Sequence, residues 1–376
     1  MRKFLCLCLG LAIGLFLLGP VSPVRADDPI KIGLMGPVTG DWASEGQGMV
    51  QVVEILAAEI NAAGGINGTQ VVVEVGDDGG TPRTAAMAAQ KLLSSNVVAV
   101  VGTYGSSVTE ATQDIYDEAG VIQIATGSTK ISLTGKGLQR FFRTCPRDDE
   151  QGRVLANNVK SLGFTKVALV HDNTSYSKGL ADEAREIFKA IGVGEVYYDS
   201  IVPNDRDYTV SLTKIQAANP DVIVFTGYYP EAGLLLRQKR ELGFNVPMIG
   251  GDATNNSSIV EIAGKEAADG YYFVSPPALP DMKSESAAKL MATYQEKYGT
   301  LPSSVWSVLA GDAFLVLVEA VKAVGPDSAK MAEWLKTGLK DFPGLSGSIT
   351  FDEHGDRVGE VYRLYKISPD GQFVIQ

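Results

Sequence analysis

Two short apolar runs, Val97–Val101 and Val121–Ala125, flank a segment with helical spacing, and this arrangement restricts the possible fold more than any other feature. Each run is rich in β-branched residues and stops at small polar residues, which is typical of a buried parallel strand followed by a turn. The segment between the runs predicts a helix, with Ser106 or Ser107 as its N-cap and Glu110 in its first turn. The stretch therefore predicts a strand–helix–strand unit of a parallel sheet.

The same alternation of strands and helices occurs in both halves of the chain. The expected strands are Ile30–Gly36, Val71–Val75, Val97–Val101, Val121–Ala125, Phe141–Thr144, Lys166–His171, Val196–Ile201, Val222–Thr226, Pro247–Gly250 and Gly270–Ser275. Helices are expected between them and, near the end, at Lys283–Tyr298 and Val305–Val324, before a β-rich tail from Ser348 to Val374. Alternating elements of this kind form βα units and parallel sheets. We therefore expect an α/β protein with two doubly wound lobes.

The N-terminus has the pattern of a secretory signal peptide. Arg2 and Lys3 precede an apolar run from Phe4 to Leu18, and small residues lead up to Ala26. This pattern predicts a signal peptide over residues 1–26 and an exported protein. The remaining residues, 27–376, exceed the usual size of one hydrophobic core, so two domains are expected.

The charge and the cysteines exclude several classes of protein. The whole chain has a formal charge of −11, and the leader contains three basic and no acidic residues, so the exported chain carries −14. Such an acidic protein is unsuited to nucleic acid or to anionic membranes. Only Cys145 remains after the leader, so no internal disulfide is expected.

The sequence contains no assembled catalytic or metal-binding motif. The two histidines, His171 and His354, lack Cys, His or paired acidic neighbours at the spacing of metal ligands. There is no Gly-x-Ser-x-Gly elbow and no phosphate-binding Walker sequence. We therefore expect neither an enzyme nor a cofactor.

Polar and aromatic residues instead gather at the predicted strand ends of both halves. The first half offers Ser106, Ser128 and Thr129, and the second offers Tyr176, Tyr228 and Asp252. In open parallel sheets, ligands bind at the carboxyl ends of the strands. Hydroxyl and N–H donors suit a carboxylate, whereas an acidic side chain suits an ammonium group. Together the two sets predict an α-amino acid site, although serine caps, packed loop tyrosines and a turn aspartate are the simpler alternatives for each residue alone.

At these residues the chain resembles a known family, the periplasmic leucine/isoleucine/valine-binding proteins, which are the solute receptors of branched-chain amino acid ABC importers. The segments that carry the resemblance are INAAGGINGTQVVV, VVGTYGSS, IATGST, VALVHDNTSYSKGLA, GYYPEAGLLLRQ, IGGD and ITFDEHGD. The resemblance implies the type I periplasmic binding protein fold, two Rossmann-like lobes with three crossovers near Cys145, Pro276 and Ser346. Lobe one then comprises 27–145 with 277–346, and lobe two comprises 146–276 with 347–376.

The resemblance also implies roles for individual residues. Ser106 matches the serine that binds the ligand carboxylate, and Gly127, Ser128 and Thr129 match the segment that binds carboxylate and ammonium. Tyr176 and Tyr228 match aromatic residues of lobe two, and Asp252 matches the acidic residue that receives the ammonium. The implied partners are a free amino acid and the permease subunits of an ABC importer, and the implied state is a monomer. A receptor for a polar amino acid, an amide, urea or aromatic acid, or a sensory receptor, remains the alternative.

The chain departs from the family pattern around the side-chain end of the site. Gly80 and Gly105 stand where some members have a disulfide, and Tyr104 stands where an aliphatic residue occurs. Glu45 falls where an aromatic residue often lines the site, with Trp42 close by. An unpaired carboxylate beside an aliphatic side chain is costly. We therefore expect Glu45 to point to solvent; the alternative is a ligand with a polar or cationic side chain.

Overall fold

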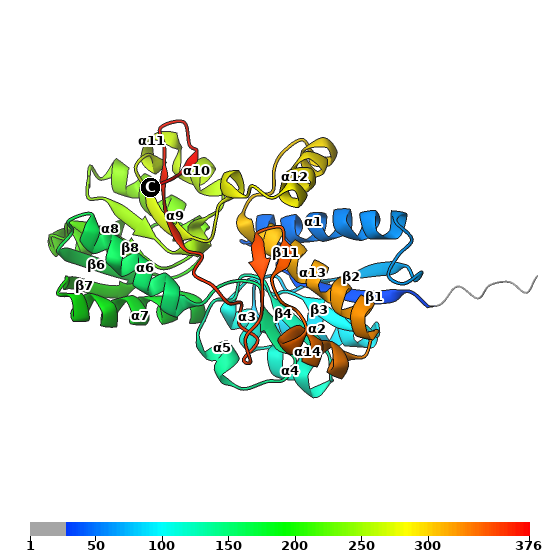
Figure 1. The fold of residues 1–376 in the computed structure, drawn as a ribbon. Helices are drawn as coiled ribbons and strands as arrows, with labels where there is room; N and C mark the ends of the chain where they lie inside the picture. Colours follow the sequence, from blue (N-terminus) through cyan, green and yellow to red (C-terminus); the bar gives the residue numbers. More distant parts are fainter. Residues whose placement is uncertain (1–27) are drawn as a thin grey trace, which may run out of the picture.

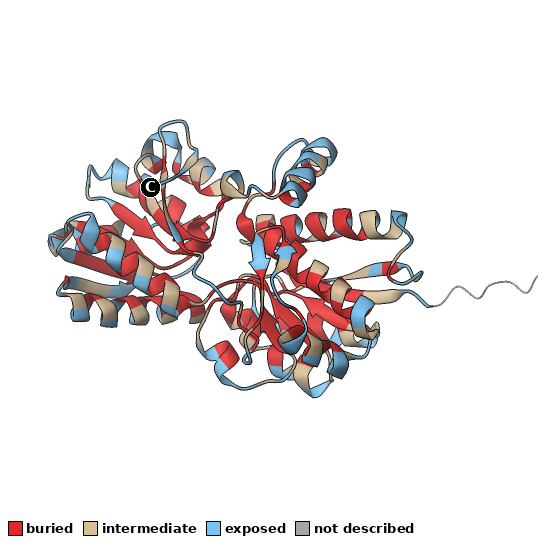
Figure 2. Ribbon diagram, viewed as in Figure 1, coloured by how far each residue is buried: buried red, intermediate tan, exposed pale blue. Residues whose placement is uncertain are grey.

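The computed structural model describes residues 28–376, so the predicted signal peptide lies outside the described residues. Two separate sheets, each flanked by helices, form the two halves of the molecule, which lie side by side in Figure 1. Figure 2 shows buried residues concentrated in the strands and along a few central helices, with exposed residues on the outer helices. Within residues 28–376, no helix is both long enough and apolar enough to cross a membrane.

The first sheet has the strand order β2-β1-β3-β4-β5, with all neighbours parallel. Its strands are β1 (Ile30–Gly36), β2 (Val71–Asp77), β3 (Ala99–Val101), β4 (Ile122–Ala125) and β5 (Phe141–Arg143). The helices on this side are α1 (Ala43–Ala62), α2 (Pro82–Ser94), α3 (Ser106–Glu110), α4 (Gln113–Glu118), α5 (Ser132–Gly135), α12 (Glu285–Tyr298), α13 (Val305–Val324) and α14 (Ser328–Thr337). The predicted βα alternation of the first half is therefore confirmed.

The second sheet has the order β14-β13-β10-β9-β8-β6-β7. Its parallel strands are β6 (Lys166–His171), β7 (Gly194–Ser200), β8 (Val222–Phe225), β9 (Met248–Gly250) and β10 (Tyr272–Ser275), and β13 (Arg363–Ile367) and β14 (Phe373–Ile375) add an antiparallel edge. The helices are α6 (Asp148–Ser161), α7 (Ser175–Ile191), α8 (Thr209–Ala217), α9 (Tyr229–Glu241), α10 (Ser258–Ala263) and α11 (Lys265–Ala268), with short 3-10 turns at Asp252–Thr254 and Leu279–Asp281. A doubly wound α/β fold is thus present twice.

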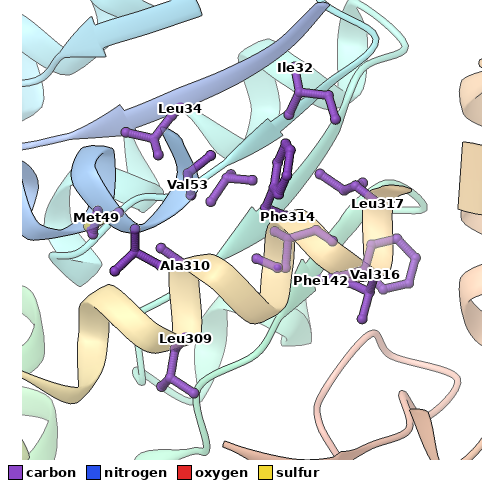
Figure 3. Close-up of a cluster of buried hydrophobic side chains, with 14 of the residues drawn as sticks. Ile32, Leu34, Met49, Val53, Phe142, Leu309, Ala310, Phe314, Val316 and Leu317 are labelled. Atoms are coloured by element: carbon purple, nitrogen blue, oxygen red, sulfur yellow. The ribbon is translucent and has the colours of Figure 1, made fainter. Parts of the chain in front are cut away.

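The core of the first half is organised around α13. Of its 20 residues, 15 are buried, as expected for a helix that is apolar on nearly every side. In Figure 3, Phe314 and Leu317 of α13 lie close to Ile32 of β1. The helix also packs closely on α1, since a Cβ added to Gly311 would lie 2.9 Å from Val52 Cγ1. This packing fixes α1 and α13 relative to the sheet, and both helices begin at the site described below.

The chain passes from one sheet to the other after β5 and after β10, and it pairs with the second sheet again from β13. The expected third crossing lay near Ser346. There, β12 (Gly347–Ile349) pairs antiparallel with β11 (Phe342–Gly344), and Phe351 contacts Phe142 at a ring-centroid distance of 5.3 Å. Asp356 still forms a bridge with Arg143 of β5, and pairing with the second sheet begins at β13. Pairing with the second sheet thus resumes after residue 356, and the three crossovers near Cys145, Pro276 and Ser346 stay predictions of the resemblance.

The helix after β3 also differs in detail from its prediction. It is split into α3 and α4, and its N-cap is Gly105, with Ser106 as the first helical residue. Neither predicted serine caps the helix, because Gly105 already adopts the extended conformation of an N-cap. Among residues 28–376, the Ser106 hydroxyl oxygen accepts only a 3.4 Å hydrogen bond from the Lys130 amide. Its O–H remains available for another acceptor.

Candidate functional site

The loops after β1, β3 and β4 of the first sheet meet the loops after β6, β8 and β9 of the second. These loops and the adjacent helix ends carry all ten predicted site residues: Trp42, Glu45, Tyr104, Ser106, Gly127, Ser128, Thr129, Tyr176, Tyr228 and Asp252. Eight of them are buried, and Trp42 and Gly127 are half-buried. The carboxyl ends of parallel strands are the usual place for a ligand.

The two halves are in contact around this region, so the site is enclosed. Ser44 Oγ lies 2.9 Å from Tyr229 Oη, and the Ser257 amide donates to the Ser303 carbonyl at 3.0 Å. On the other flank, Lys130 Nζ donates to Ser175 Oγ at 2.7 Å. Contacts on both flanks describe a closed arrangement in which the central residues are shielded from water.

On the first sheet's side, some hydroxyls form hydrogen bonds within the protein, and others can still donate to a bound group. Ser128 Oγ lies 2.7 Å from Thr109 Oγ1 and donates to the Tyr104 carbonyl at 3.1 Å, so it holds the loop in shape. Thr129 Oγ1 lies beside the Asp148 carboxyl and lowers its pKa without forming a hydrogen bond of standard geometry. Together with the Ser106 hydroxyl, Thr129 therefore offers a donor to a bound group.

On the second sheet's side, Asp252 is the centre of a buried network. Tyr176 Oη donates to Asp252 Oδ1 at 2.8 Å and Tyr362 Oη donates to Oδ2 at 2.6 Å. The Asp252 amide donates to Gln151 Oε1 at 2.8 Å. Burial raises the pKa of Asp252 to about 7, although these hydrogen bonds oppose the shift. A cationic group placed here would restore the charged carboxylate.

A second buried carboxylate lies next to Asp252. Asp148 Oδ1 accepts from Gln151 Nε2 at 2.8 Å, whereas Oδ2 has no hydrogen-bond partner among the described residues. Burial, reinforced by the charge of Asp252, raises the pKa of Asp148 well above its usual range. The charge of the buried Arg143 opposes this shift without cancelling it, so a further cationic group in this corner would stabilise the ionised carboxylates.

Sequence reasoning missed Asp148, Gln151 and Tyr362. The first two lie in α6, where their only sequence signal was the start of a helix after the first half. Tyr362 lies just before β13, more than a hundred residues from Asp252, and no local pattern connects the two. Only the placement of the tail on the second sheet brings this phenol to the site.

Aromatic rings form the other end of the site. Trp42 stacks on Tyr228 with centroids 4.1 Å apart, and Tyr104 contacts both edge-on at 5.6 and 5.8 Å. Trp306, at the start of α13, lies 6.0 Å from Tyr104 and was not predicted. Gly127 allows the Tyr104 ring to pass, because a Cβ there would lie 2.7 Å from Tyr104 Cδ2. Tyr104 Oη is buried and has no hydrogen-bond partner among residues 28–376.

The expectation that Glu45 points to solvent is wrong. Its side chain is completely buried, because α1 already begins at Ala43 and its first turn faces the start of α13. Asn256 Nδ2 donates to Glu45 Oε1 at 2.6 Å, and the Ser304 hydroxyl donates to Oε2. Burial raises the pKa of Glu45 to about 7.

The described residues contain no group of three His, Cys, Asp or Glu side chains placed to hold a metal ion. What they hold together is a pair of free hydroxyl donors on one side, a pair of buried carboxylates on the other, and an aromatic end. Such an arrangement is suited to a small molecule that carries both a negative and a positive group.

Comparison with known proteins agrees with this geometry. Residues 29–372 match the model of a family described as periplasmic binding protein. A Leu/Ile/Val-binding protein of Rhizobium johnstonii is 36% identical over 342 residues, covering 90% of this chain and 91% of the relative.

Two solved structures are similar throughout. A leucine binding protein from Thermotoga maritima has a TM-score of 0.85 and 30% identity, covering 92% of this chain and 97% of its own. A branched-chain amino acid transporter substrate binding protein from Streptococcus pneumoniae, in complex with isoleucine, has a TM-score of 0.85 and 32% identity, covering 93% and 100%. The chain is thus a solute-binding protein and not an enzyme. It belongs to the periplasmic binding protein family, in the group of the Leu/Ile/Val-binding proteins.

Proposed function

We propose that this protein binds a free branched-chain or other aliphatic α-amino acid between its two halves and delivers it to the permease of an ABC importer. The observation that carries the proposal is the pairing of free hydroxyl donors, Ser106 and Thr129, with the buried Asp252 across one enclosed site. The relatives and structures named for leucine and isoleucine support the class of ligand.

In this proposal each set of residues binds one part of the amino acid. Ser106 and Thr129 donate to the carboxylate, and Asp252 accepts from the ammonium group, whose charge also compensates Asp148. Tyr176 and Tyr228 pack on the aliphatic part. Glu45 already receives donors from Asn256 and Ser304, which favours an aliphatic over a cationic side chain.

The proposed mechanism is hinge closure of two lobes around the solute. Residues 28–145 with 277–356 would form one lobe, and 146–276 with 357–376 the other, with the last boundary moved to follow the observed pairing. Residues 1–26 would direct the protein to the periplasm, where it acts as a monomer and presents its closed form to the membrane permease.

A thermal-shift screen tests the function. The protein without residues 1–26 is heated alone and with each common amino acid, a set of amides and a set of carboxylic acids. Leucine, isoleucine or valine at about 100 times its dissociation constant should add roughly 2.7 kcal/mol of stability. A shift with only polar or basic amino acids would contradict the aliphatic assignment. A shift with only acids that lack an amine would contradict the role of Asp252.

A further inference from the structure

The indole of Trp42 lies directly against the backbone of two glycines. Trp42 precedes α1, in the loop after β1. A Cβ added to Gly80 would lie 2.9 Å from Trp42 Cε3, and a Cβ added to Gly105 would lie 2.9 Å from Cζ3. Cβ atoms essentially never approach another heavy atom this closely, so any larger residue would displace the ring. The two glycines therefore form a seat for the indole.

The requirement for glycine differs between the two positions. Gly80 has a φ of +69°, a conformation that favours glycine whatever lies nearby. Gly105 has a φ of −85°, which any residue adopts. Of the three atoms nearest the Cβ position of Gly105, two belong to Trp42 and the third, Tyr228 Oη, lies at an ordinary 3.6 Å. The ring of Trp42 is thus the close contact that Gly105 accommodates.

From this seat, Trp42 reaches across to the other half of the molecule. Its ring stacks on Tyr228, which directly precedes α9, with an interplanar angle of 30° and centroids 4.1 Å apart. Trp42 and Tyr228 also line a hollow of about 200 Å³ between the halves, together with Asp41, Thr81 and Pro203. Tyr228 also contacts Tyr176, a donor to Asp252, at a ring-centroid distance of 5.3 Å, so the stacked pair lies between this hollow and the polar groups around Asp252.

The stack is a contact between the two halves, so it forms when they close. Aromatic pairs contribute about 0.5–1.5 kcal/mol beyond the area that they bury. A contact that exists only in the closed form slows opening more than it changes the first encounter with the solute, which depends on the open form.

We propose that Trp42, seated on Gly105 and Gly80, is a positioning residue that holds the closed form by stacking on Tyr228, and so sets the rate of solute release. This inference rests on the proposed function. The polar groups recognise the solute, and the Trp42–Tyr228 stack determines how long it stays.

A double-mutant cycle on the solute dissociation rate tests whether the Trp42–Tyr228 stack slows release. Association and dissociation rates are measured by stopped-flow with the amino acid identified in the thermal screen, for wild type, Trp42→Ala, Gly105→Ala and the double variant. Each single variant should raise the dissociation rate about tenfold and change the association rate much less. Gly105→Ala should add nothing in the Trp42→Ala background, because the ring that its methyl displaces is gone.

Two further variants serve as controls. Gly135→Ala adds a methyl where no atom lies within 4 Å of the Cβ position, and should leave both rates unchanged. Trp42→Phe keeps an aromatic ring, so it should retain part of the slow release. It replaces Trp42→Ala in the comparison if that variant proves unstable. Thermal unfolding of every variant without solute separates a loss of folding from faster release.

The opposing outcomes are distinct. If Gly105→Ala raises the dissociation rate equally in both backgrounds, the ring is not what this glycine accommodates. If Trp42→Ala slows association and leaves dissociation unchanged, the proposal that the Trp42–Tyr228 stack sets the rate of release is refuted. If the wild type binds the amino acid normally and both single variants release it at the wild-type rate, the role of the Trp42–Tyr228 stack is refuted and the proposed function stands. If the wild type binds no amino acid, the proposed function is refuted, and the role of the stack with it.

Discussion

Two buried carboxylates, Asp252 and Glu45, have similar burial and similar pKa values, but their hydrogen-bond donors come from different parts of the molecule. Burial raises the pKa of each to about 7, and each accepts hydrogen bonds from two side chains. The donors to Asp252, Tyr176 and Tyr362, both lie on the second sheet's side. Glu45 receives Ser304 from its own side and Asn256 from the opposite side.

This difference separates two tasks that a buried acid performs. Asp252 is held in place by its own half whether or not the halves are closed, so it is ready to receive a cation from the cleft. Glu45 completes its hydrogen bonds only when Asn256 arrives, so it contributes to closure. Similar burial and similar pKa therefore do not identify a ligand-binding acid, and the origin of the hydrogen-bond donors distinguishes the two.

The largest effect is expected from Asp252→Asn. The amide keeps the shape of the side chain and removes the charge that pairs with the ammonium group. Losing one member of a buried charged pair costs about 2–5 kcal/mol, which weakens binding at least 30-fold. Isothermal titration calorimetry with the amino acid measures the change, and an unchanged melting temperature without solute shows that the fold is intact. Normal affinity would show that Asp252 does not bind the ammonium group, and the contrast drawn between Asp252 and Glu45 would be wrong.

The pH dependence of binding should distinguish the two acids by sign. We expect the pKa of Asp252 to stay raised toward 7 in the open form, because the residues bonded to it belong to its own half. A solute ammonium then ionises Asp252, so binding releases its proton and weakens as the pH falls below about 7. Closure buries Glu45 and raises its pKa toward 7, so closure takes up a proton and weakens as the pH rises from about 4.5 to 7. The two effects oppose each other in the wild type.

Glu45→Gln isolates the effect of Asp252. In this variant the dissociation constant should rise by up to about tenfold for each pH unit below 7, more steeply than in the wild type. Dissociation constants of both proteins between pH 5.5 and 8 provide the test. Equal slopes would show that Glu45 does not change its protonation on closure.

A matched pair of asparagines tests the role of Glu45 in closure. Asn256→Ala leaves the buried Glu45 with one donor fewer in the closed form, and an unsatisfied buried group costs about 1–3 kcal/mol, so affinity should fall about tenfold. Asn255→Ala is the control, because Asn255 donates to Ser275 of β10 on its own side. It should lower the melting temperature and leave affinity nearly unchanged. Equal effects of both variants on affinity would contradict a closing role for Glu45.

The smallest effect is expected from Tyr362→Phe. The ring remains, and Asp252 loses one of its two phenol donors while Tyr176 keeps the other. One hydrogen bond contributes about 1 kcal/mol net, so affinity should fall about fivefold. A competition assay with the amino acid that the wild-type protein binds measures such a change. A loss as large as that of Asp252→Asn would mean that Tyr362 contacts the solute itself.

The sequence predicted the elements with strong local patterns. The bounds of β6 and α13 agree with the predicted Lys166–His171 and Val305–Val324. These segments are apolar with a clear period, and burial on both sides leaves their pattern little affected by context. The third crossover was implied by the resemblance alone, because no local pattern tells which sheet β12 and β13 join.

For the site, residues at strand ends were predictable and residues from remote elements were not. The positions after β3, β4, β8 and β9 follow from the rule that ligands lie at the carboxyl ends of parallel strands. Trp306, Tyr362 and Asn256 reach the site through helix packing, the position of the tail and closure, none of which leaves a local signal.

By itself, the sequence determined the two α/β halves, the acidic composition and the family resemblance, because periodicity, charge and motif order are properties of the chain alone. Only the tertiary structure decided that Glu45 is buried and that Trp42 lies on Gly105. Burial and close packing depend on which distant segments meet, and the energy of a carboxylate or an indole depends on those neighbours rather than on its position in the chain.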